Sequence, residues 1–425
     1  MKEKRNLLEE MGNRVITFHD MLAQQSPEEA WPLDAMASYF KLVKGAKEAG
    51  KTLVWINFAT IPELFWAMDM IPVSIDTLNA FVITAPGGQA LKYIDIAEQY
   101  LPDYVCGLHK IAFGAMMEGD MPIPNLMVTP TAPCDSGLST YPMIAEHFGI
   151  PHFYIDVPYE RDERSSQYLA NELRRLVSFL EEQTKRKLDF NRLKQVMEYS
   201  NRAHEINGKL LKLEGNVPCP VSSLDMIGDN GMMLSMAGTQ WMVDRLEKRY
   251  EQAEDRVSKK QGHLAKENLR LVWSYGSPMF DQNIIFPYLE QKYGAINAQI
   301  LMNFDYEPPK DISDIDKIYR SLAQKVFATP MTRECGGHSE YYMDRLINLV
   351  KNFKADGVVF GGHVACQRGW ALSKLLTDKV YDELGISTLN FELDFYDPRI
   401  TSMETIKAKL HDFITVVLKK NAIGE

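Results

Sequence analysis

Five cysteines are the residues of this sequence that bear most directly on chemistry: Cys106, Cys134, Cys219, Cys335 and Cys366. An odd and sparse set in a chain of 425 residues argues against a disulfide framework. No two of them have the C-x-x-C spacing that is typical of a zinc ribbon or knuckle. The open alternatives are therefore buried cysteines without a chemical role, a reactive thiol, or metal ligands.

Cys134 and Cys366 occupy equivalent places in the sequence. Each follows a predicted strand and precedes a predicted helix, in the loops 130–137 and 361–370. Parallel α/β folds bind ligands in such loops, at the carboxyl ends of the strands. A helix N-terminus also favours the thiolate form of a cysteine. If the two halves of the protein face each other, both sulfur atoms approach one site; the alternative for each is a buried free cysteine.

Cys106, in the segment 103–110 before a predicted helix, is a candidate third ligand. Three thiolates without zinc-type spacing suit an iron–sulfur cluster that is gathered from separate loops. Cys335 lies in a Gly-rich loop and is a weaker candidate, whereas Cys219, between Pro218 and Pro220, is interpreted as structural.

Candidate acid–base groups lie close to these loops in sequence. His109, His338 and His363 are each near a cysteine, so each is a candidate to hydrogen-bond a cluster sulfur or to donate a proton. Glu63 and Asp76 flank a predicted α/β turn region and are candidate acids or bases. The alternatives are satisfied histidines and solvated or helix-capping carboxylates.

Short apolar strands alternate with helical stretches and predict an α/β fold. Strand-like runs are expected at 52–58, 71–75, 126–128, 152–155, 269–273, 298–302, 357–360 and 387–391. Two regions repeat one pattern of strand, cysteine loop, helix, Gly-Ile and strand, at 126–155 and 357–391. We therefore predict two similar parallel-sheet halves of the Rossmann or flavodoxin-like kind, with an N-terminal helical segment and a helical insertion.

The expected domain organisation follows from these patterns. Residues 1–50 form the N-terminal helical segment, and 51–160 form the first α/β half with Cys106 and Cys134. Residues 161–268 form the helical insertion, in which a Gly/Pro/Ser-rich piece at 218–231 is expected to interrupt the helices. Residues 269–425 form the second half with Cys366.

Residues 45–52 match the phosphate-binding pattern G-x-x-x-x-G-K-[ST]. That loop requires a strand before it and a helix after it, so that backbone amides face the phosphate. Here a predicted helix precedes the loop and a predicted strand follows it. We interpret the match as chance, so any use of ATP is expected to depend on a partner protein.

Charge and hydropathy restrict the function further. The net charge of −10 gives no electrostatic support for binding nucleic acid. No apolar run reaches the roughly 18–20 residues of a membrane span, and the N-terminus lacks the apolar core of a signal peptide. A cytoplasmic protein with a small-molecule substrate, and with neither a nucleic-acid nor a membrane partner, is expected.

Taken together, these motifs resemble the large iron–sulfur components of the 2-hydroxyacyl-CoA dehydratase and benzoyl-CoA reductase superfamily. The resemblance extends from about residue 41 to about residue 413. Its landmarks are Pro62-Glu63-Leu64, Met68-Asp69, Asp103-Tyr104-Val105-Cys106, Pro133-Cys134-Asp135, Asp356-Gly357-Val358-Val359, Ala365-Cys366, Asp394 and Asp397-Pro398-Arg399. The order and spacing of these landmarks carry the resemblance.

The resemblance implies a cofactor and a partner. In that superfamily three cysteines of a subunit hold a [4Fe–4S] cluster, and they match Cys106, Cys134 and Cys366. A separate ATPase with its own cluster energises an electron and passes it to the large component. The superfamily fold is a pair of α/β halves with helical additions around the cluster.

The branches of the superfamily differ in their reactions. Dehydratases are usually heterodimers with a hydroxyl-bearing residue shortly before the P-E-L motif, where this sequence has Phe58, while a family carboxylate matches Asp76. Double-cubane proteins are homodimers that reduce small molecules under anaerobic conditions. Their bridged [8Fe–9S] cluster needs six thiolates, so a chain with five cysteines would have to share it across a homodimer.

We therefore predict an ATP-dependent, low-potential iron–sulfur reductase that works as a homodimer and reduces a small molecule. One alternative is a subunit of an (R)-2-hydroxyacyl-CoA dehydratase or of a benzoyl-CoA reductase. The other is a non-enzymatic α/β binding protein with incidental cysteines.

Overall fold

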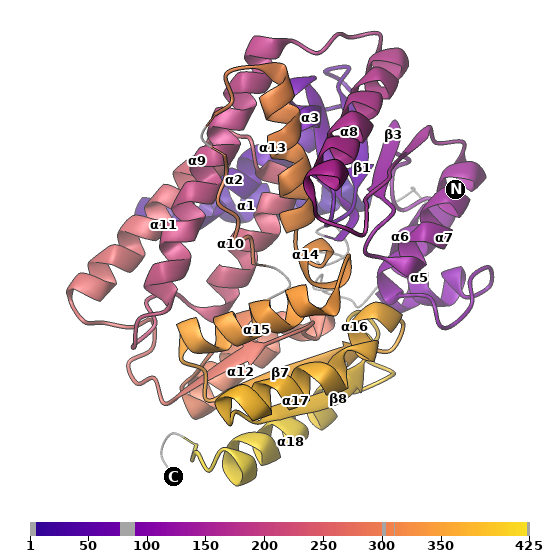
Figure 1. Cartoon of the computed structure of the whole chain (residues 1–425). Coiled ribbons are helices and arrows are strands. Elements are labelled where there is room, and N and C mark those ends of the chain that lie inside the picture. The colour runs from indigo at the N-terminus through magenta and orange to yellow at the C-terminus, as the bar shows by residue number, and fades with distance from the viewer. Residues whose placement is uncertain (1–5, 77–89, 300–302, 310, 423–425) are drawn as a thin grey trace.

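A computed structural model describes residues 6–76, 90–299, 303–309 and 311–422 of the chain. The predicted strand at 298–302 therefore falls in part on residues 300–302, which lie outside the described residues. The described part contains two separate parallel sheets and a large set of helices around them (Figure 1).

The first sheet contains β1 (Thr52–Ile56), β2 (Met70–Ser74), β3 (Leu126–Pro130) and β4 (His152–Ile155), in the order β2-β1-β3-β4. The second contains β5 (Leu269–Trp273), β6 (Ala295–Gln299), β7 (Gly357–His363) and β8 (Thr388–Leu393), in the order β6-β5-β7-β8. Every neighbouring pair in both sheets is parallel. The predicted α/β class with two similar halves is confirmed, because each sheet has the same flavodoxin-like order of its own four strands.

The helices that belong to the first sheet precede and connect its strands. They are α1 (Leu7–Gln25), α2 (Pro27–Lys44), α3 (Glu63–Ala67), α5 (Ala90–Ala97), α6 (Gly107–Glu118) and α7 (Asp135–Phe148). The 45–52 motif is a turn between α2 and β1, so a helix does precede it and a strand does follow it.

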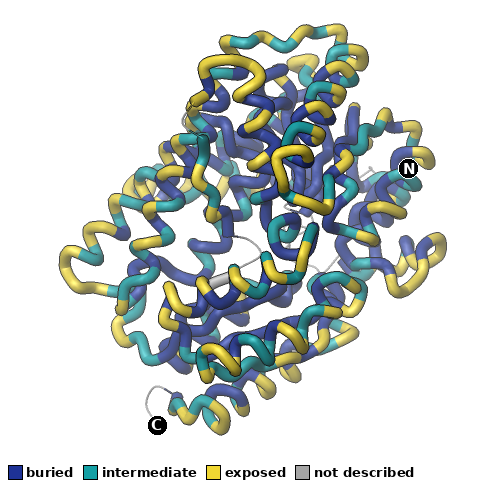
Figure 2. Tube along the Cα trace, viewed as in Figure 1, coloured by how far each residue is buried: buried dark blue, intermediate teal, exposed yellow. Residues whose placement is uncertain are grey.

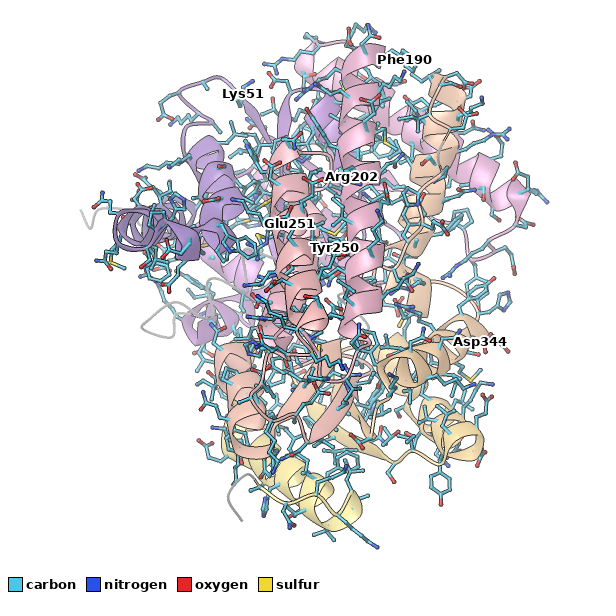
Figure 3. All side chains as sticks on the ribbon, turned by 90° about the vertical axis from the view of Figure 1, so that its left-hand side faces the viewer. Lys51, Phe190, Arg202, Tyr250, Glu251 and Asp344 are labelled. Atoms are coloured by element: carbon cyan, nitrogen blue, oxygen red, sulfur yellow. The ribbon has the colours of Figure 1, made fainter. Side chains whose placement is uncertain are left out.

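The middle of the chain is helical, with α8 (Glu163–Thr184), α9 (Phe190–Glu214), α10 (Ser223–Met236) and α11 (Gln240–Ser258). Figure 3 shows α9 and α11 side by side, with Arg202 on α9 and Tyr250 on α11. The guanidinium of Arg202 pairs with Glu247 at 2.8 Å and joins the two helices.

The expected interruption at 218–231 is wrong for its second half, since α10 begins at Ser223. The hydroxyl of Ser222 accepts a hydrogen bond from the backbone N–H of Asp225 at 3.0 Å and caps this helix. A side-chain cap and an apolar stripe outweigh the low helix propensity of Gly228 and Gly231.

The second sheet is covered by the remaining helices. They are η1 (Met279–Asp281), α12 (Gln282–Tyr293), α13 (Ile315–Ala328), α14 (Thr332–Cys335), α15 (Ser339–Phe353), α16 (Gln367–Ala371), α17 (Ser373–Leu384), α18 (Met403–Asp412) and the π-helical η2 (Phe413–Val417). Helix α13 is an exception, because it leaves the second sheet and packs on α8 and α9 (Figure 1).

The two Gly-Ile repeats mark helix ends. Gly149 follows α7 with φ +65° and Gly385 follows α17 with φ +67°, a left-handed conformation that glycine adopts without a steric cost. The repeat in the sequence therefore reflects the same helix-to-strand turn in both halves.

The buried residues of the protein are concentrated around the two sheets. Figure 2 shows the interior of both halves as buried and the outer helix surfaces as exposed. Leu169, Leu173, Leu176 and Leu180 recur at helical spacing on α8, and all four are fully buried. Among the described residues, every helix falls short of the length and apolarity that a membrane crossing requires.

Candidate active site

A cavity of about 330 Å³ lies where the carboxyl ends of the two sheets meet. Nearly every strand end contributes to it: Phe58 after β1, Asp76 after β2, Cys134 after β3, Tyr275 after β5, Cys366 after β7 and Phe395 after β8. Both sheets place their ligand-binding edges at this cavity, as expected for parallel α/β halves that face each other. Helix α10 supplies a further wall.

The three predicted cysteine ligands all line this cavity. Each is the N-cap residue of a helix: Cys106 of α6, Cys134 of α7 and Cys366 of α16. The backbone N–H of Gly137 donates a hydrogen bond to the Cys134 sulfur at 3.2 Å. Free N–H groups at helix starts stabilise negative charge, so these positions favour bound thiolates.

Two glycines allow this packing. A Cβ on Gly107 would lie 2.7 Å from Oδ1 of Asp394, and one on Gly137 would lie 2.8 Å from the ring of Tyr141. Both glycines stand in the first turn of a cysteine-capped helix. The close approach of α6 to the loop after β8 therefore depends on Gly107.

Burial and mutual repulsion control the thiol charges. Burial raises the pKa of Cys106 well above its usual range, and the neighbouring Asp394 and Cys134 raise it further. Burial likewise raises the pKa of Cys134 to about 12, with a further contribution from Cys366. These thiols are protonated at neutral pH unless a positively charged group binds between them, as a metal does when it takes thiolate ligands.

Two of the predicted histidines contact two of the cysteines. The Nε2 atom of His363 lies 2.9 Å from the Cys106 sulfur, and that of His109 lies 3.5 Å from the Cys134 sulfur. Burial lowers the pKa of both imidazoles, to about 3 for His109. Neutral rings with the proton on Nε2 would donate to the sulfur atoms. The other ring nitrogen of His363, Nδ1, lies 3.9 Å from Oδ2 of Asp394.

Asp76 lines the cavity as a buried carboxyl. One oxygen accepts hydrogen bonds from the backbone N–H of Phe58 at 2.7 Å and from the Ser74 hydroxyl at 3.3 Å. Burial raises the pKa of Asp76 to about 7, and these hydrogen bonds only partly oppose the shift. A carboxyl with this pKa can both give and take a proton near neutral pH.

The other candidates are not brought to the cavity. Glu63 is fully buried and binds Ser200 and Lys325, so it links α3 to α9 and α13. His338 is exposed, and its Nε2 atom lies 3.1 Å from Glu160. For both residues, nearness in sequence to a motif does not bring the side chain to the site.

The two remaining cysteines are also buried outside the cavity wall. Cys335 ends α14, where burial raises its pKa well above the usual range and the nearby Cys366 raises it further. The thiol of Cys219 donates to the backbone oxygen of Val221 at 3.3 Å, as expected for a structural residue.

Comparison with known proteins identifies the family. The family model for the 2-hydroxyglutaryl-CoA dehydratase D-component matches residues 59–416, a range that includes Cys106, Cys134 and Cys366. The chain belongs to this family. The predicted resemblance to the 2-hydroxyacyl-CoA dehydratase superfamily is thereby confirmed.

Three relatives are similar in sequence to this chain. The chain is 22% identical to the (R)-phenyllactyl-CoA dehydratase alpha subunit of Clostridium sporogenes, over 88% of the chain and 92% of that protein. It is 19% identical to the lactoyl-CoA dehydratase subunit alpha of Anaerotignum propionicum, over 89% and 94%. It is 22% identical to the (R)-2-hydroxyglutaryl-CoA dehydratase subunit alpha of Acidaminococcus fermentans, over 66% and 57%. All three relatives are enzyme subunits.

The cysteines of this D-component family member suit a cluster better than a single ion. Across residues 6–76, 90–299, 303–309 and 311–422, no three His, Cys, Asp or Glu side chains lie close enough to ligate one metal ion. The three thiols instead surround a cavity. Nδ1 of His109 and the hydroxyl of Tyr141 are buried beside this region and have no hydrogen-bond partner in the described structure. Separated soft ligands around a cavity fit an iron–sulfur cluster.

Sequence reasoning missed the residues that follow β5 and β8. Tyr275, Ser277, Phe395 and Tyr396 all line the cavity. Burial and the neighbouring Cys366 raise the pKa of Tyr275 well above its usual range. The signal was available, because Tyr275 follows β5 as Phe58 follows β1, and the two halves of this fold repeat each other.

Proposed function

We propose that this protein is the catalytic iron–sulfur subunit of an ATP-dependent, two-component (R)-2-hydroxyacyl-CoA dehydratase. The observation that carries the proposal is the set of three helix-capping cysteines around one largely apolar cavity. Dehydratase subunits among the relatives support the reaction class. The cavity of about 330 Å³ would hold both the cluster and the reacting part of the thioester.

Cys106, Cys134 and Cys366 would hold a [4Fe–4S] cluster. When bound, such a cluster supplies one-electron chemistry at low potential. His363 and His109 would donate Nε2–H hydrogen bonds to two ligand sulfurs, at the separations of 2.9 and 3.5 Å. These hydrogen bonds would fix the orientation of the thiolates and help to set the potential.

The remaining cavity residues would handle protons and exclude water. Asp76 would hold the mobile proton on its carboxyl, since its pKa of about 7 allows both protonation states near neutral pH. Phe58, Phe395 and the apolar face of α10 would keep water from the reacting groups. We do not assign a catalytic role to Glu63 or His338, which lie away from the cavity.

Two partners belong to the proposal. A separate cluster-containing ATPase would deliver the electron, because the 45–52 motif of this chain is a turn between a helix and a strand. A second large subunit would complete the enzyme, since the relatives are named as alpha subunits. The assembly would work in the cytoplasm under anaerobic conditions.

Phe58 supports a second candidate, the small-molecule reductase. It lines the cavity at the place where the family resemblance puts a hydroxyl-bearing residue in dehydratases. In this version the protein is a homodimer with a bridged [8Fe–9S] cluster, to which each subunit contributes Cys106, Cys134 and Cys366. Five cysteines per chain require this sharing.

One experiment distinguishes the two reactions. The holoenzyme, its ATPase, ATP and a limiting reductant are incubated anaerobically with an (R)-2-hydroxyacyl-CoA. Many enoyl-CoA molecules per electron supplied would support the dehydratase, since water loss needs no net reduction. Electron consumption in proportion to a reduced product would support the reductase. Recovery of unchanged thioester, with no electrons consumed above the thioester-free control, would contradict the dehydratase.

A further inference from the structure

The cavity is bounded on one side by helix α10, whose cavity face carries two glycines. Gly228 and Gly231 of α10 both line the cavity, and a Cβ on either would meet no other atom within 4 Å. Packing against the protein therefore does not require glycine at these positions. Glycine in a helix interior costs about 1 kcal/mol relative to alanine, so these two positions leave space at a cost in helix stability.

The residues around this space are apolar. Leu224, Ile227, Met232 and Leu234 of the same helix line the cavity, and Met279 and Met331 line it from the second half of the chain. Leu224, Gly228 and Gly231 are spaced by four and three residues, which places them on one helix face. Flexible methionine side chains adapt to apolar groups of different shape.

Among the described residues that line the cavity, carboxyl groups are present and cationic side chains are not. Asp76 and Asp135 line it, whereas no lining residue in the described part of the chain is Lys or Arg. Arg368 reaches a lining residue, but its Nε already pairs with Asp135 at 2.9 Å. A second carboxylate on the substrate would therefore be buried without a basic partner, which is strongly unfavourable.

We propose that the substrate carries a neutral, bulky, apolar acyl side chain, and that Gly228 and Gly231 make room for it. This inference rests on the proposed dehydratase function and deepens it. The relatives are named for an aromatic, a small aliphatic and a dicarboxylic acyl group. The apolar lining and the absence of a cationic lining residue among the described residues favour an aromatic or branched aliphatic acyl group over a dicarboxylic one.

The charge part of the inference is tested on the wild-type holoenzyme by anaerobic calorimetric binding. The matched probes are (R)-2-hydroxyglutaryl-CoA and its neutral isostere (R)-2-hydroxy-5-methylhexanoyl-CoA. We expect the neutral thioester to bind at least ~100-fold more tightly, because burying an unpaired carboxylate costs several kcal/mol. Equal affinity, or tighter binding of the dicarboxylic thioester, would overturn this part.

The size part uses the substitutions Gly228→Leu and Gly231→Leu, with Gly208→Leu as the matched control. Gly208 is a helical glycine of α9 whose Cβ would also meet nothing within 4 Å, but it does not line the cavity. We expect the cavity variants to lose at least ~10-fold in affinity for (R)-phenyllactyl-CoA relative to (R)-lactoyl-CoA, because an added side chain removes the space for the ring. The control should leave this ratio unchanged.

The outcomes separate this inference from the proposed function. If Gly228→Leu does not fold, Gly228→Ala measures the same ratio with a smaller expected change in the same direction. If the cavity variants kept the wild-type ratio of affinities for the two thioesters, Gly228 and Gly231 would not provide the acyl space. Thioester binding would in that case still support the dehydratase. If no thioester bound the holoenzyme at all, the proposed function would fail and this inference with it.

Discussion

At the residue scale, the account depends on where three thiols lie. Cys106, Cys134 and Cys366 were selected from loop position and family resemblance, and the structure places all three on one cavity. The same reasoning misplaced His338 and Glu63, because it used distance along the chain. His363 reaches Cys106 only because the two sheets, far apart in sequence, face each other, whereas His109 contacts Cys134 within the first half.

The Cys134→Ser variant should lose most of its iron, because a hydroxyl is a poor ligand for iron–sulfur iron. Cys219→Ser is the matched control, a buried cysteine with no place on the cavity wall. Iron per chain and the cluster absorbance are measured after anaerobic purification of both. Full iron in Cys134→Ser would remove this residue from the ligand set.

The buried carboxyl of Glu214 should make the free energy of unfolding depend on pH. Burial raises its pKa to about 8, against the opposing effect of Arg249 and Arg270. A raised carboxyl pKa means that the folded state holds a proton that the unfolded chain has lost, so stability falls as pH rises from about 4.5 to about 8. Glu214→Gln should therefore match the wild type near pH 4.5 and be more stable at pH 9, by up to about 4 kcal/mol.

Urea unfolding at both pH values measures this difference. Glu205→Gln, on the exposed side of the same helix, is the control and should show little gain at pH 9, since Glu205 is paired with Lys209 in water. If the stability advantage of Glu214→Gln did not grow with pH, the prediction would be wrong. The Glu214 carboxyl would then ionise in the folded state without a loss of stability.

At the element scale, the repeated pattern of strand, cysteine loop, helix and Gly-Ile was predictable from sequence. The five-residue strands β1 and β5 are mostly apolar and largely buried, so they are recognisable in the sequence without a structure. Helix α10 was not predicted in full, because Gly228 and Gly231 read as loop residues. Their role depends on a cavity formed by distant segments, which local patterns do not contain.

Two glycine substitutions should have opposite effects. Gly385→Ala forces alanine into a left-handed conformation and should destabilise the fold by about 1 kcal/mol. Gly208→Ala lies inside α9 with free space around its Cβ, so it should stabilise the fold by up to about 1 kcal/mol. Thermal unfolding of the two variants beside the wild type checks the signs; equal signs would refute the assigned backbone roles.

At the scale of the whole molecule, a buried ion pair connects segments that are distant in sequence. Lys325 of α13 binds Glu63 of α3, and Ser200 of α9 binds the same carboxylate oxygen. The pair ties α13, which follows the second sheet's β6, to the helices around the first sheet. No sequence pattern predicts this pairing, because the partners are 262 residues apart.

Lys325→Met should destabilise the protein by roughly 3–5 kcal/mol, since it leaves the Glu63 carboxylate buried without a cation. The double variant Glu63→Leu with Lys325→Met should recover most of that loss, because two apolar side chains can fill the same space. Denaturant unfolding of the single and double variants gives the coupling. A double variant as unstable as the sum of its single variants would show that the pair does not act as a unit.

Counting iron and acid-labile sulfide per chain, in protein purified without oxygen, shows whether Cys106, Cys134 and Cys366 hold a cluster. The account predicts about four irons per chain with an equal amount of sulfide, as expected for one [4Fe–4S] cluster. Sulfide in excess of iron would favour the bridged cluster of the reductase. Folded protein without iron or sulfide would contradict the cluster, the ligand assignment and the proposed function together.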